Sequence, residues 1–127
     1  MKKDIIDRQD IDLLLHTFYD ELLKDNTINY IFIDVVKIDM EVHIPIIANF
    51  WESVLLHKNL YHNNPIKIHL DMNQKTPLLK HHFDTWLHYF ISTVDKLFEG
   101  DVATMAKERA ISIATVMRIK IAQQSSV

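Results

Sequence analysis

The sequence predicts an all-α protein. Apolar residues recur every three or four positions over residues 10–24, 40–57, 77–97 and 101–122, which is the spacing that lines one side of an α-helix. The single glycine and the three prolines fall between these stretches or in their first turns. A chain of 127 residues without internal repeats has the size of one domain, so we expect a single helical domain over residues 1–127.

The composition argues against several classes of function. Without cysteine there is no disulfide, no thiolate metal ligand and no cysteine nucleophile. One glycine leaves no glycine-rich loop for phosphate, which argues against nucleotide binding. The net charge is -3 and the basic residues are scattered, so nothing favours nucleic acid. The charged amino terminus and the lack of an apolar run of about 20 residues predict a soluble cytoplasmic protein without a membrane span.

The first predicted helix, residues 10–24, has a tyrosine on its apolar face. We expect the Tyr19 ring to be buried and its hydroxyl to need a partner, of which a backbone carbonyl is the ordinary choice. The short apolar stretch that follows, residues 28–33, fits either a strand or a helical turn. A helical turn that places Phe32 inward is more consistent with a chain that offers no partner strand.

The helix predicted over residues 40–57 has a histidine inside its apolar stripe. The stripe consists of Met40, His43, Ile47, Phe50 and Val54, flanked by Ile46, Trp51 and Leu55. Because proline is tolerated only in the first turns, Pro45 indicates that the helix begins near Met40 or Glu41. A buried imidazole without a hydrogen bond costs about 1–3 kcal/mol. His43 should therefore meet a polar group inside the protein, which in the ordinary case is a neighbouring carbonyl.

A second histidine lies among aliphatic residues between Pro65 and Pro77. Residues 66–72 are too few for a long helix. They fit a single helical turn that presents His69 to a pocket, and they equally fit a surface loop with an incidental histidine.

The last two predicted helices have clear boundary signals. Thr76 is expected as the N-cap of the first of them, with Pro77 at its first helical position and Gly100 after its end. Trp86 lies on the inner face of this helix, and its indole N–H asks for an acceptor. The final helix is expected to start with Asp101 as its N-cap.

Four inward polar side chains in so small a core indicate that they face one shared polar group, such as a bound metal or cofactor. They are Tyr19, His43, His69 and Trp86. No Cys, Asp or Glu is expected on the apolar faces to complete a zinc or di-iron site, and no Glu-x-x-His motif is present. A flat apolar cofactor with one metal, held by one histidine and faced by hydrogen-bond donors, would satisfy all four.

Five short motifs follow one another along the chain: Phe18-Tyr19, Ile31-Phe32, His43 followed by Ile47-Ala48-Asn49-Phe50-Trp51, Pro65 with Lys67-Ile68-His69-Leu70, and Phe83-Asp84-Thr85-Trp86-Leu87. In this combination of motifs the chain resembles the truncated haemoglobins, and among them the third group. Each motif is weak alone, but their order and spacing over nearly the whole chain are specific. The lack of double-glycine turns also agrees with the third group.

The resemblance implies a two-over-two helical sandwich around haem b, iron protoporphyrin IX, with His69 as the proximal ligand of the iron. The implied contacts are Tyr19, His43 and Trp86 on the distal side, and Phe32, Ile47, Phe50 and Trp51 against the porphyrin. In one respect the chain departs from the family, whose members often have a basic residue three positions after the distal histidine, where this chain has Ile46. Lys67 is then the candidate partner of a haem propionate, unless it is simply a solvated lysine.

The function that the resemblance implies is binding of dioxygen and other small ligands, such as CO, NO and cyanide. Tyr19 and Trp86 would donate hydrogen bonds to bound oxygen. Since a charge-assisted hydrogen bond contributes about 1.5–3 kcal/mol, two donors would slow release by roughly 100-fold. Tight binding favours gas or reactive-species chemistry over transport. His43 has three open roles: a gate, a proton donor or acceptor for peroxide, or a sixth ligand of the iron.

Two alternatives from other classes of function remain open. One is an enzyme with peroxidase-like or nitric-oxide-detoxifying turnover, which would need a reductase as a partner. The other is a haem-free helical interaction module in which all four polar residues are structural. A Soret absorption band would separate the haem proteins from the module. For the oligomeric state, a monomer is the default expectation.

Overall fold

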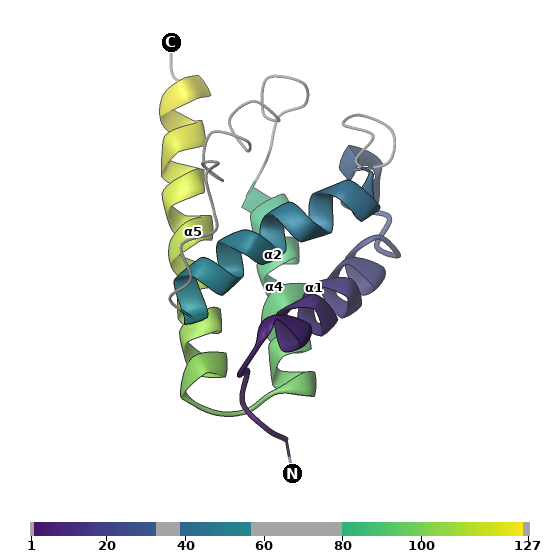
Figure 1. Ribbon diagram of the computed structural model, residues 1–127. Coiled ribbons are helices and arrows are strands. Elements are labelled where there is room, and N and C mark those ends of the chain that lie inside the picture. Colours follow the sequence, from purple (N-terminus) through teal and green to yellow (C-terminus); the bar gives the residue numbers. More distant parts are fainter. Residues whose placement is uncertain (1, 33–38, 57–79, 126–127) are drawn as a thin grey trace.

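The computed structural model describes residues 2–32, 39–56 and 80–125 of this chain. The long helices are α1 (Arg8–Leu22), α2 (Met40–Leu56), α4 (Lys80–Leu97) and α5 (Asp101–Ser125), and the described residues contain no strand (Figure 1). The predicted all-α class is therefore confirmed. None of the helices in these ranges is both long enough and apolar enough to cross a bilayer.

The helices form two pairs that cross each other. Figure 1 shows α1 and α2 slanting side by side across α4 and α5, and contacts join α1 to α2, α4 to α5, and α1 to α4. This is the expected two-over-two arrangement. Its core contains buried side chains from all four of these helices and from the segments just before and just after α1, and the largest fully buried ones are Phe18 of α1 and Phe90 of α4.

The observed helix boundaries lie close to the expected ones. α1 begins two residues earlier than expected, because the Asp7 side chain accepts a hydrogen bond from the Asp10 amide at 3.0 Å and caps the helix. α2 begins at Met40 with Pro45 in its second turn, as expected. The expected cap of α4, Thr76 with Pro77, lies outside the described residues.

The ambiguous stretch after α1 is helical, as expected. Backbone amides of Ile28 and Asn29 donate to the Asp25 carbonyl, and the Ile31 amide donates to the Ile28 carbonyl. These are the short-range bonds of helical turns, so the strand alternative is wrong for residues 28–32. Phe32, at the end of these turns, is partly buried and packs against the core.

The face of α2 that enters the core differs from the expected one. The buried side chains are Ile44, Ala48, Trp51, Glu52 and Leu55. The expected stripe is only partly buried, and it comprises Met40, His43, Ile47, Phe50 and Val54. The two rows are adjacent on the helix and both are largely apolar, so periodicity alone could not tell which row meets α1 and the core.

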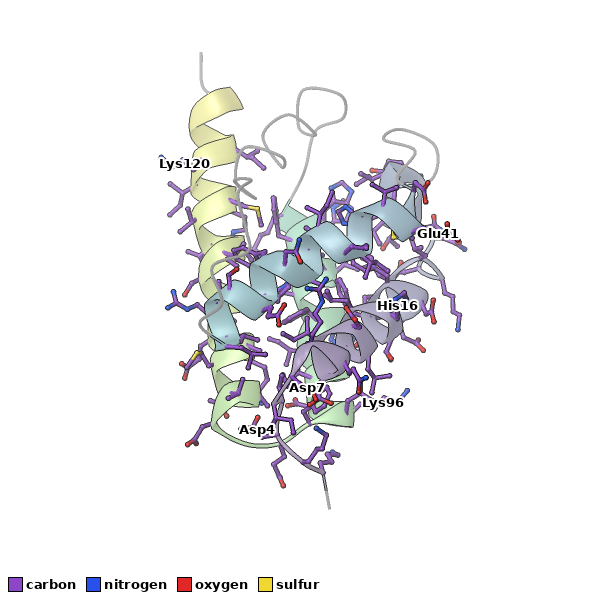
Figure 2. The ribbon with its side chains drawn as sticks, viewed as in Figure 1. Asp4, Asp7, His16, Glu41, Lys96 and Lys120 are labelled. Atoms are coloured by element: carbon purple, nitrogen blue, oxygen red, sulfur yellow. The ribbon has the colours of Figure 1, made fainter. Side chains whose placement is uncertain are left out.

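The N-terminus of α5 is capped by a residue from the opposite end of the chain. The Asp4 carboxylate accepts hydrogen bonds from the amides of Val102 at 2.9 Å and Ala103 at 2.8 Å. Asp101, the expected cap, is instead the first helical residue. Figure 2 shows Asp4 and Asp7 in the segment that leads into α1, at the end of the molecule where α4 turns into α5.

Gly100, between α4 and α5, is required by this cap. Its φ of 143° is one that residues with a side chain rarely adopt, and a Cβ there would lie 2.5 Å from the Asp4 carboxyl carbon. The turn and the cap therefore depend on each other.

We expect Asp4→Ala to destabilise the fold by about 1 kcal/mol, the usual effect of losing a helix cap. Burial alone would raise the pKa of Asp4, but the amide bonds from Val102 and Ala103 outweigh it and lower the pKa below 3.8. A lowered native pKa means that the stabilisation is present above about pH 4 and is lost as the pH falls through the native pKa. Urea unfolding should therefore give a difference between wild type and variant at pH 7 that shrinks near pH 3.

The matched control for this prediction is Asp101→Ala, which removes an exposed carboxylate from the same helix end without breaking the cap. A stability difference for Asp4→Ala that stays constant between the two pH values would contradict the capping role.

Candidate functional site

A tyrosine and a histidine from neighbouring helices meet at the centre of the candidate site. Tyr19 of α1 is 6% exposed, and its hydroxyl oxygen lies 2.9 Å from Nε2 of His43 on α2. The two rings meet edge to face, with centroids 5.4 Å apart. The expectation that each group needs a polar partner is confirmed. The partner of the tyrosine is the imidazole and not the ordinary backbone carbonyl.

The protonation state of Tyr19 follows from its burial. Removal from water disfavours the phenolate and raises the pKa of Tyr19 well above its ordinary value of 10.0. The hydroxyl therefore keeps its proton throughout the physiological range. The protonated Tyr19 hydroxyl can donate one hydrogen bond and also accept, and its role toward His43 depends on the tautomer of that ring. The Tyr19 ring packs against the Phe18 and Phe32 rings, at centroid distances of 4.8 and 6.4 Å.

Trp86 is held by aromatic packing. It lies in the second turn of α4, partly buried, stacked on Phe90 at 5.6 Å with 8° between the ring planes and edge-on to Phe18 at 5.9 Å. The indole was expected to have an acceptor nearby, but among the residues that the structure describes no hydrogen bond of this group is seen. Packing against Phe18, which also contacts Tyr19, brings the indole into the same aromatic cluster as the Tyr19–His43 pair.

The residues expected to face a porphyrin fall into two sets. Phe32, Ile47 and Phe50 are partly buried and border the core. Trp51 is only 3% exposed, and its ring stacks on Phe90 at 4.9 Å. Within the first set, Phe32 contacts the Tyr19 ring at a centroid distance of 6.4 Å, and Ile47 and Phe50 follow His43 on the same side of α2. Trp51 instead forms part of the buried core.

Two expected site residues, Lys67 and His69, lie outside the described residues. Their assigned roles, partner of a propionate and ligand of the iron, remain predictions.

The sequence reasoning missed a charged cluster at the interface of α1 and α2. No acidic residue was expected on the apolar faces, yet Glu52 is buried on α2 and its carboxylate accepts a hydrogen bond from Arg8 at 2.9 Å. Asn49 accepts a second bond from the same guanidinium at 2.8 Å. The available signal was the spacing of Asn49 and Glu52, which places two polar side chains on one face of a helix that is otherwise rich in apolar residues.

A second tyrosine–histidine contact was also missed. The hydroxyl of Tyr30 lies 3.0 Å from Nε2 of His82, the third residue of α4. Burial, with a smaller contribution from His81, lowers the pKa of His82, so the ring is neutral at neutral pH. This contact ties the turn that contains Phe32 to α4. No pattern in the sequence indicated it, because the two residues are 52 positions apart.

Comparisons of the sequence and of the fold both find a group III truncated hemoglobin. The chain is 29% identical over 118 residues to the group 3 truncated hemoglobin ctb of Campylobacter jejuni subsp. jejuni, covering 91% of both chains. The fold is similar to the crystal structure of the group III truncated hemoglobin from Campylobacter jejuni, with a TM-score of 0.82, 27% identity and 95% of each chain covered. No family model matches the chain. The resemblance predicted from the sequence motifs is confirmed in both sequence and fold.

Proposed function

We propose that this chain, which resembles group III truncated haemoglobins in sequence and in fold, is a haem protein that binds small gaseous ligands at an iron held by His69. The observation that carries the proposal is the Tyr19–His43 pair, in which a buried hydroxyl and an imidazole meet beside a partly buried apolar row of α2. Burying these two polar groups has a free-energy cost, which a bound ligand that uses them would offset.

The described residues fit a flat, largely apolar cofactor. A haem needs apolar side chains against its ring and polar groups near the axis of its iron. Ile47, Phe50 and Val54 offer apolar surface that is only partly covered, one helical turn apart on the same side of α2. His43 continues this row, so its bond to Tyr19 places the polar groups at one end of the apolar surface.

When bound, haem b supplies an iron that takes up a diatomic ligand and polarises it. The residues of this chain then act on the polarised ligand. Tyr19, whose raised pKa keeps its proton in place, donates a hydrogen bond to the ligand in the tautomer in which Nε2 of His43 carries a hydrogen and donates to the tyrosine oxygen. Trp86 is the second donor, through its indole N–H. In a pocket from which water is excluded, such bonds are stronger than in solution.

The structure supports a further role for His43. Its Nε2 is bonded to Tyr19, so the imidazole orients the tyrosine hydroxyl. The gate and sixth-ligand roles considered above would both require His43 to leave this bond, since Nε2 cannot hold Tyr19 and bind the iron at the same time. A ferric absorption spectrum of His43→Ala separates ligation from orientation, because loss of a low-spin six-coordinate spectrum would demonstrate direct binding to the iron.

The decisive test of the proposal is the visible absorption spectrum of the purified chain, before and after reduction and exposure to carbon monoxide. We expect a Soret band that is present on purification or appears on adding haemin, and that shifts on reduction with CO. A chain with no Soret band and no gain on adding haemin would instead be a haem-free helical module.

A further inference from the structure

One arginine joins α1 to three successive positions on α2. Arg8, the first residue of α1, donates from Nη1 to Asn49 Oδ1 at 2.8 Å and to Glu52 Oε1 at 2.9 Å. Its Nη2 donates to the backbone carbonyl of Pro45 at 3.3 Å. Its Nε donates to Asp12 Oδ1 at 3.1 Å, within α1. Positions 45, 49 and 52 are separated by four and three residues, so the guanidinium spans two turns along one face of α2.

The chemistry of the cluster requires an arginine. A guanidinium presents several N–H donors in a fixed plane, whereas a lysine ammonium could not reach all of these acceptors in this geometry. The Glu52 side chain is 12% exposed and that of Arg8 is 32% exposed, so water screens the pair only partly. Partial burial would lower the pKa of Arg8, but hydrogen bonds with Glu52 and Asp12 raise it, and the group stays charged.

A second hydrogen bond between side chains joins the same two helices at the candidate site, between Tyr19 and His43. Pro45, whose carbonyl Arg8 contacts, is two residues beyond His43. Because proline has no amide hydrogen, the first turns of α2 lack one of their own hydrogen bonds, at the Glu41 carbonyl. The part of α2 that holds His43 is therefore less constrained by its own helix, and contacts with α1 have more influence on where it sits.

We propose that Arg8 is a positioning residue for the ligand pocket: by fixing α2 on α1 it sets the geometry of the Tyr19–His43 pair, without touching ligand or haem. The effect on ligands rests on the proposed function. The effect on the pair does not, because Tyr19 and His43 contact each other within the protein itself.

The test compares Arg8→Met with wild type by two measurements that respond to pocket geometry. The first is the ¹⁵N NMR signal of the His43 ring, recorded on the full chain as purified, with any haem iron held in the diamagnetic ferrous CO state. We expect it to shift toward the values of a free histidine. The second is the C–O stretching frequency of the CO form, which we expect to broaden or shift. Oxygen dissociation should accelerate by roughly 10-fold, the low end of the effect of outer-shell partners.

Two matched controls isolate the contacts between the helices. Asp12→Asn disturbs only the bond within α1, and Lys80→Met removes an exposed ion pair with Asp84 on α4. Neither should move the His43 signal or the C–O frequency. If Arg8→Met lowers the melting temperature but leaves both measurements unchanged, Arg8 is merely structural and the proposal is overturned.

Further variants keep the test decisive if Arg8→Met does not fold. Arg8→Lys keeps the charge without the planar fork, and Glu52→Gln keeps an acceptor without the charge. Both should move the His43 signal in the same direction as Arg8→Met, and an unchanged signal in both would refute the positioning role. If the wild-type chain takes up no haem, the proposed function fails, and the His43 signal still decides the role of Arg8.

Discussion

Replacing His69 by alanine is expected to remove the Soret band from the purified protein, the largest effect that we predict. In the proposed function this imidazole binds the iron on its proximal side, and the residues that pack against the porphyrin ring are apolar. Changes at outer-shell partners alone weaken metal binding by roughly 10–100-fold. Loss of the ligand itself should exceed that range, measured as the haem retained per chain after purification and as the affinity for added haemin.

Two companion variants make the His69 experiment specific. His69→Gly leaves space for free imidazole, which should restore the iron spectrum when it is added to the solution. His81→Ala removes an exposed imidazole from the start of α4 and should leave the spectrum unchanged. A His69→Ala protein with its full complement of haem and an unaltered spectrum would disprove the assignment of the proximal ligand.

The second large effect concerns the two donors on the distal side. Tyr19→Phe keeps the ring that packs on Phe18 and Phe32 and removes only the hydroxyl. A hydrogen bond to a charged acceptor contributes about 1.5–3 kcal/mol, so its loss should accelerate oxygen dissociation by roughly 10- to 100-fold. Trp86→Leu should act in the same direction, and both changes together should exceed either alone. Stopped-flow mixing of the oxygenated protein with carbon monoxide measures these rates.

The controls for the donor experiment separate hydrogen bonding from packing. Trp86→Phe also lacks the N–H but can preserve the stack on Phe90, so agreement with Trp86→Leu would attribute the effect to the donor. Tyr89→Phe removes a hydroxyl that donates to Asp25 at 2.8 Å and should leave the rate unchanged. The donor account is wrong if Tyr19→Phe and Trp86→Leu both dissociate oxygen at the wild-type rate.

Much of the fold could be predicted because the relevant signals are local. The start of α2 follows from Pro45, and the helical turn at residues 28–32 follows from the absence of a partner strand. The cap of α5 could not be predicted, because Asp4 is about 100 positions away in the chain and only the tertiary fold brings it to this helix. Asp101 has a carboxylate at the start of the helix and was therefore the expected N-cap, and this prediction was wrong.

The site was predictable in kind but not in pairing. Tyr19 and His43 both lie on apolar helix faces, so each was expected to have a hydrogen-bond partner inside the protein. The structure shows that the two side chains bond to each other. Periodicity could not identify this, because it places a residue on a face without saying what the face meets. Glu52 illustrates the same limit: its burial depends on Arg8, whose charge is brought to it only when α1 packs on α2.

The stacking of both indoles on Phe90 has a practical consequence for spectroscopy. Trp51 and Trp86 are the two tryptophans of the chain, and they come from different helices, α2 and α4. Tryptophan emission therefore originates at one place, around the Phe90 ring. In the haem-free protein, a change in this emission on denaturation will report the loss of packing around Phe90, and it will be insensitive to fraying at the far end of α5.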